Sequence, residues 1–179
     1  MRSISEPEAA GVAVSSLDRR IAGLAALAVV IHLAEAALPS PLPGIKPGLA
    51  NVVVLYALLR HGLQVALWVG LLRVLVGSLL LGTFLSPGFF LSLSGAVASL
   101  AVLALMHRLP GLSGPGLAVP AAMAHVMGQF LTAYVWFIPH AGLFHLLPAF
   151  LTAALLFGLA GGLAVNRLLD RGLAREGRA

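Results

Sequence analysis

Long apolar runs, separated by short breaks rich in proline and glycine, make up most of this chain. A membrane-spanning helix needs about 20 mostly apolar residues, and Pro-Gly pairs interrupt helices and favour turns. The pattern therefore predicts about six spanning helices, at residues 20–38, 47–60, 62–82, 88–107, 116–138 and 143–167. The second run is short, so we expect it to be tilted or to begin with an irregular stretch buried in protein. Alternatively, residues 47–82 form one kinked hairpin.

The two ends of the chain differ from this apolar middle. Residues 1–19 mix acidic, basic and polar side chains without an apolar core, so we expect a cytoplasmic tail rather than a cleaved signal peptide. Residues 168–179 form a second, basic cytoplasmic tail. The sequence thus predicts an all-α polytopic membrane protein whose six-helix transmembrane domain covers residues 20–167.

Composition narrows the class of protein. Of the 179 residues, 60% are hydrophobic and 9% are charged, and the mean hydropathy is +1.02. A soluble domain carries about 25% charged residues, so these values exclude a soluble enzyme or a soluble nucleic-acid-binding domain. The length suits a single domain, and the lack of cysteine excludes a disulfide scaffold.

Basic residues lie almost entirely on one side of the predicted topology. Lys46 occupies the opposite side, whereas the tails and loops of the first side carry Arg2, Arg19, Arg20, Arg60, Arg108, Arg167, Arg171, Arg175 and Arg178. Lys and Arg are enriched in cytoplasmic loops. We therefore expect both termini to be cytoplasmic in the plasma (inner) membrane. The net charge of +5 is attributed to this topology and not to a nucleic-acid partner.

Two ionisable residues fall inside predicted spans, where such residues are costly and usually face the bundle interior. Arg73 is close to the middle of its span, so it needs a partner or a water-filled cavity. Glu35 lies near the outer end of its span, and Arg73, Lys46 or water could be its partner. The pair is a structural ion pair that fixes helix register, an anion-binding site centred on Arg73, or both.

Other polar side chains also lie within the apolar spans. His125 and Gln129 are four residues apart and share one helix face, and Asn51 lies just inside the second span. In lipid such groups face inward, where they hydrogen-bond between helices or bind a ligand. The candidate substrate-binding residues are Glu35, Lys46, Asn51, Arg73, His125 and Gln129.

Aromatic residues gather near the predicted outer loops. They form either an interfacial belt or a wall for an apolar ligand. The residues are Phe84, Phe89, Phe90, Tyr134, Trp136, Phe137 and Phe144.

Small residues recur at four-residue spacing, which lets helices approach closely. Such pairs serve either packing inside the bundle or docking to a partner membrane subunit. They are Ala22 and Ala26, Gly95 and Ser99, and Gly158 and Gly162.

Several kinds of catalytic chemistry have no matching residues in the sequence. It has no GxxxxGK[ST] loop for ATP, no GxSxG and no cysteine nucleophile. The acidic residues of the apolar part do not cluster as an Mg²⁺–diphosphate enzyme requires. Histidines lack the four-residue spacing of helical zinc sites. We therefore expect no enzyme activity, no cofactor and no metal.

Three stretches carry a resemblance to a known family. They are residues 43–51, residues 73–89, and His125 with Gly128-Gln129. They resemble the Gx transporter family, also labelled heptaprenyl diphosphate synthase component I, over about residues 20–167. Pro47 stands where that family usually has Leu, and Val126 where it usually has Asn.

The family is similar to the substrate-capture subunits (S components) of energy-coupling factor (ECF) transporters. That similarity implies six helices, a vitamin- or precursor-like ligand bound near the outer face, and a shared ATP-driven module. It also implies docking to this module through small residues of the first helix, here Ala22 and Ala26.

Three functions remain open at this stage. The first is a solute-capture subunit that binds a small anionic molecule from the outer face and is energised by a separate ATPase. The second is a membrane subunit of a flavin- or quinone-linked redox assembly. The third is an accessory component of heptaprenyl diphosphate or quinone synthesis.

Overall fold

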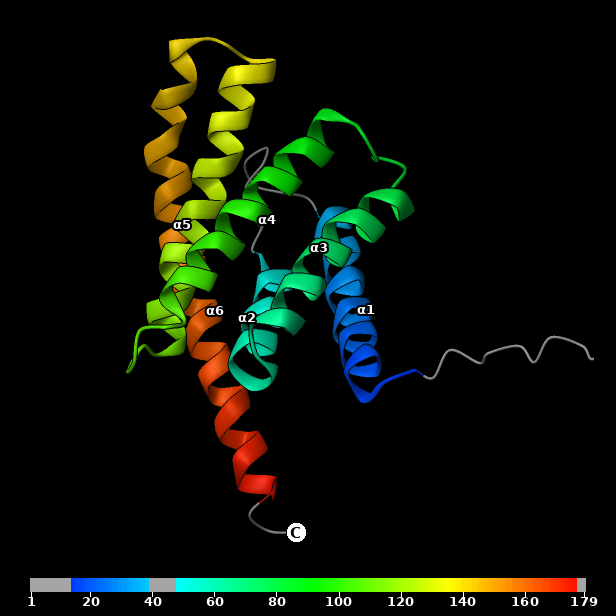
Figure 1. Ribbon diagram of the computed structural model, residues 1–179. Coiled ribbons are helices and arrows are strands. Elements are labelled where there is room, and N and C mark those ends of the chain that lie inside the picture. The colour runs from blue at the N-terminus through cyan, green and yellow to red at the C-terminus, as the bar shows by residue number, and fades with distance from the viewer. Residues whose placement is uncertain (1–13, 39–47, 177–179) are drawn as a thin grey trace, which may run out of the picture.

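Local sequence signals set most helix boundaries in the computed structural model (Figure 1), which describes residues 14–38 and 48–176. Ser15 and Asp18 form a capping box at the start of α1 (Ser16–Ala37). Ser86 caps α4 (Pro87–Met106) and Ser113 caps α5 (Gly114–Thr132), in each case with proline in the first turn. Gly62, at φ +91°, separates α2 (Leu49–His61) from α3 (Leu63–Leu80).

The chain then passes through two irregular helical turns before its last helix. A π-helical turn, η1 (Ala133–Phe137), extends α5, and a 3₁₀ helix, η2 (Ala141–Leu146), leads into α6 (Leu147–Glu176). The described residues contain no strand. The predicted all-α membrane bundle is therefore confirmed.

Within residues 14–38 and 48–176, five helical segments are long and apolar enough to cross a membrane: Ser16–Ala37, Leu63–Leu80, Pro87–Met106, Gly114–Phe137 and Ala141–Gly172. The remaining helix, α2, has 13 residues, which corresponds to about 20 Å of helix against a hydrocarbon core of about 30 Å. The second predicted span is thus short, as expected, and its regular part begins only at Leu49.

The helix ends differ from two predicted boundaries. Helix α1 begins at Ser16, inside the predicted amino-terminal tail, because its capping box lies at Ser15 and Asp18. Helix α6 continues to Glu176, well into the predicted carboxy-terminal tail of residues 168–179. Basic residues suit the last turns of a helix because they complement its dipole, so loss of hydrophobicity there does not end the helix.

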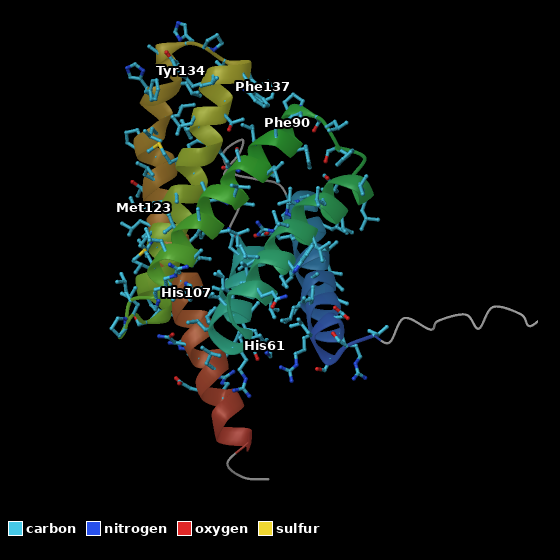
Figure 2. The ribbon with its side chains drawn as sticks, in the orientation of Figure 1. His61, Phe90, His107, Met123, Tyr134 and Phe137 are labelled. Carbon is cyan, nitrogen blue, oxygen red and sulfur yellow. The ribbon has the colours of Figure 1, made fainter. Side chains whose placement is uncertain are left out.

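The helices pack as two groups of three that meet along α3 and α4 and along α2 and α6. Helices α1, α2 and α3 form one group, and α4, α5 and α6 form the other (Figure 1). The start of α1 and the end of α6 lie at the same end of the bundle. His61 and His107 lie toward that end, whereas Tyr134 and Phe137 lie at the other (Figure 2).

Two of the predicted small-residue pairs pack inside the bundle. A Cβ atom on Gly162 would lie 2.5 Å from backbone atoms of Pro115, and one on Gly158 would lie 3.0 Å from the Cα of Val119. Helices α5 and α6 therefore touch nearly backbone to backbone. On α4, Ser99 is buried and Gly95 faces α5.

We expect Gly162→Ala to destabilise the protein by about 1–3 kcal/mol, because the added methyl group meets backbone that cannot move aside. The measurement is the thermal unfolding midpoint of the purified protein in detergent. Gly172→Ala is the matched control on the same helix, since nothing lies within 4 Å of its Cβ position. An unchanged midpoint for Gly162→Ala would contradict the close packing.

Single cysteines test the relative sides of the loops, because the chain has no cysteine of its own. Val14→Cys and Leu109→Cys, both at exposed positions, are expected to react with an impermeant maleimide from one side of membrane vesicles. Ala141→Cys, at the exposed first residue of η2, is expected to react only from the other side. Reaction of all three from one side would contradict the topology.

Candidate functional site

A cavity of about 310 Å³ lies where the two helix groups meet, and every α-helix contributes to its lining. Five predicted site residues line it together: Glu35, Asn51, Arg73, His125 and Gln129. The sixth, Lys46, lies outside the described residues. The sequence thus predicted side chains from separate helices that the fold brings to one place.

Glu35 caps the start of α2. Its side chain is 4% exposed. Its Oε1 accepts a hydrogen bond of 2.6 Å from the backbone N–H of Leu49, and its Oε2 accepts one of 3.5 Å from that of Ala50. Gly48, at φ +69°, offers α2 no side-chain cap of its own. A carboxylate at a helix amino terminus satisfies free amide groups and complements the helix dipole.

Arg73 reaches the same helix from α3. Its side chain is 5% exposed, and its Nη1 donates a hydrogen bond of 2.6 Å to Oδ1 of Asn51. Its Nε is buried and has no hydrogen-bond partner within the described part of the chain. Glu35 and Arg73 are thus both tied to the first turn of α2, an arrangement that their separation in sequence did not reveal.

His125 and Gln129 lie on the face of α5 that meets α4. A Cβ atom on Gly95 would come within 2.8 Å of His125 Nε2 and 2.9 Å of Gln129 Cγ, so glycine is needed for this approach. The Nδ1 of His125 is buried without a hydrogen-bond partner among the described residues. Two buried side-chain nitrogens, one from Arg73 and one from His125, thus lack a hydrogen-bond partner among the described residues, and neither is accessible to water.

Glycine also shapes the opposite wall of the cavity. His32 of α1 packs over Gly77 of α3, where a Cβ atom would lie 2.7 Å from the histidine Cδ2. His32 lines the cavity, as do Ser92 and Ser99 of α4. These three residues were not among the predicted site residues. For His32, the signal was its three-residue spacing from Glu35, which places both on one helix face.

The aromatic wall of the cavity comes from α6 and not from the outer loops. Phe150 and Phe157 line the cavity. The seven predicted aromatics instead contact one another: ring centroids lie 5.0 Å apart for Phe84 and Phe89 and 5.5 Å apart for Phe90 and Trp136. None of the seven is among the described lining residues. Their position at one end of the bundle, where Figure 2 labels three of them, suits an interfacial belt.

Ala22 and Ala26 differ from the other small-residue pairs. Both are exposed on α1, whereas their neighbours Ala25 and Ala28 are buried in the core. This face of α1 is therefore free to meet lipid or another protein. Among residues 14–38 and 48–176, no group of three or more His, Cys, Asp or Glu side chains could hold a metal ion.

A comparison with known protein families identifies the family to which the chain belongs. The sequence profile of heptaprenyl diphosphate synthase component I matches residues 24–168, which include all five described site residues. The chain belongs to this family. As its description implies, a heptaprenyl diphosphate synthase component I works with a partner component. No curated protein and no solved structure matches the chain.

We expect Glu35→Ala to destabilise the protein by about 1–3 kcal/mol, because two backbone N–H groups lose their acceptor inside the bundle. Glu35→Gln retains one side-chain oxygen and should lose less. The thermal unfolding midpoint in detergent measures both effects. A midpoint equal to wild type for Glu35→Ala would show that another group caps α2.

Proposed function

We propose that this chain is the substrate-binding subunit of a membrane transporter, similar to an ECF S component. It captures a small, vitamin- or precursor-like anionic solute. The proposal rests on the buried Arg73, whose side chain lines a cavity of about 310 Å³. Ligand pockets occupy roughly 300–1,000 Å³, and a charged side chain within a membrane bundle usually marks a substrate pathway.

The solute enters from the outer face of the plasma (inner) membrane. The lining includes the carboxy-terminal part of α1, the start of α2 and Gly88 at the start of α4, which lie toward the end opposite the start of α1, and it extends through the bundle to Leu103 of α4 and Ala118 of α5. The basic residues Arg19, Arg20 and Arg171 flank the end where α1 begins and α6 finishes, which the positive-inside rule assigns to the cytoplasm.

A separate ATPase module supplies the energy, because this chain has no phosphate-binding loop. The exposed Ala22 and Ala26 of α1 provide the surface that docks to a transmembrane coupling subunit. The description of the family as a component supports the existence of such a partner. In this proposal the chain binds and releases its solute without changing it chemically.

The family description favours one second candidate, an accessory role in heptaprenyl diphosphate synthesis. Proteins that copurify after mild detergent extraction distinguish the candidates. An ATPase supports the transporter subunit, a polyprenyl synthase supports the accessory role, and flavoproteins without an ATPase support a redox assembly.

We expect wild-type protein to copurify with a small molecule that Arg73→Gln loses by about tenfold or more, because removing one partner of a buried charge pair costs at least this much. Mass spectrometry of the extracted small molecules measures the loss. Arg108→Gln, at an exposed arginine beside the end of α4, is the matched control and should retain the molecule. Equal retention by both variants would remove Arg73 from the site.

A further inference from the structure

Two formally charged side chains line the cavity among the described residues, and they have opposite signs. The carboxylate of Glu35 is already bound to the backbone amides of Leu49 and Ala50. Among the described residues, the guanidinium of Arg73 donates its hydrogen bond to a neutral amide oxygen, that of Asn51, and the carboxylate of Glu35 also acts on it electrostatically. Arg73 is therefore the side chain that brings a permanent positive charge to the described lining, which contains no second Arg or Lys.

Asn51 holds Arg73 without neutralising it. Its Oδ1 accepts the hydrogen bond from Nη1 and orients the guanidinium. Because Asn51 lies in the first turn of α2, its position depends on the amides that Glu35 holds. An aspartate at this position could accept the same hydrogen bond, but its charge would cancel that of Arg73.

We infer that the cavity takes a ligand with a single acid group rather than a diphosphate, and that the neutral Asn51 is the residue that determines this selectivity. The inference rests on the proposed function and specifies the ligand class of the same site. One negative charge on the ligand is balanced by Arg73, because the partial positive charge at the start of α2 is already matched to Glu35. A second negative charge would find no further Arg or Lys in the lining that the structure describes, and a buried charge without a partner is strongly unfavourable in a bundle interior.

The cavity volume and the uncharged lining residues limit the size and chemistry of the rest of the ligand. The cavity volume of about 310 Å³ equals that of roughly ten water molecules. Phe150 offers an aromatic face, and Ser92 and Gln129 offer hydrogen bonds. A compact ring or short apolar body that carries one carboxylate, phosphate monoester or similar group suits this lining.

Three probes of the full-length protein in detergent test the ligand class: benzoate, its neutral analogue benzamide, and inorganic pyrophosphate. Equilibrium binding and the thermal unfolding midpoint are measured for each. We expect saturable binding of benzoate that is about tenfold or more tighter than that of benzamide, because benzoate alone pairs with Arg73. Pyrophosphate should leave the midpoint unchanged.

Asn51→Asp tests the role of the neutral amide. This variant should keep its unfolding midpoint but lose about tenfold or more of its benzoate affinity, because Arg73 is then neutralised, while benzamide binding stays the same. If Asn51 had a purely structural role, the unfolding midpoint, the benzoate affinity and the benzamide affinity would all fall together. Asn166→Asp is the matched control: Asn166 accepts a hydrogen bond of 3.0 Å from the backbone N–H of Gly114, outside the cavity.

Equal affinity for benzoate and benzamide in the wild type overturns the inference, as does unchanged benzoate binding by Asn51→Asp. Binding of pyrophosphate also overturns it, and loss of that binding in Lys46→Gln would identify the second cation. If Asn51→Asp does not fold, the comparison of benzoate with benzamide binding by the wild-type protein still tests the inference. If Arg73→Gln loses a copurified solute and that solute is neutral or multiply charged, only the inferred ligand class is refuted. The proposed function is then retained. If no probe binds and no solute copurifies, both proposals fail.

Discussion

The start of the short helix α2 is the constraint on which the rest of the site depends. In lipid, every backbone polar group must find its partner within the protein. Glu35 of α1 supplies the acceptor for the first amides of α2. Asn51, one residue beyond those amides, then holds Arg73 of α3. Three helices are thus tied together by polar groups that would each be costly if left alone.

The site also depends on close packing between helices. Helix α5 lies nearly backbone to backbone against α6 at Gly162, and Asn166 of α6 caps the start of α5. Gly95 lets His125 lie against α4, as Gly77 lets His32 lie against α3. These contacts leave the cavity at the junction of the two helix groups instead of filling it with side chains.

The family is described by a diphosphate synthase, so the charges that line the cavity can be compared with those that a diphosphate needs. A diphosphate needs several cations or metal ions, whereas the described lining offers the single guanidinium of Arg73 beside the engaged carboxylate of Glu35. The proposed binding of a singly charged solute agrees with this lining, and the exposed Ala22 and Ala26 are the surface that we propose for the partner component.

The sequence by itself determined the fold class and most of the polar lining. Hydropathy locates helices because the cost of exposing polar groups to lipid is local, and the same cost forces Arg73, His125 and Gln129 inward. The sequence could not indicate that Glu35 binds amides near residue 50, or that Phe150 and Phe157 line the cavity instead of Phe90 and Trp136. Only the tertiary structure decided these pairings, because they depend on which helices become neighbours and on where glycine lets them approach.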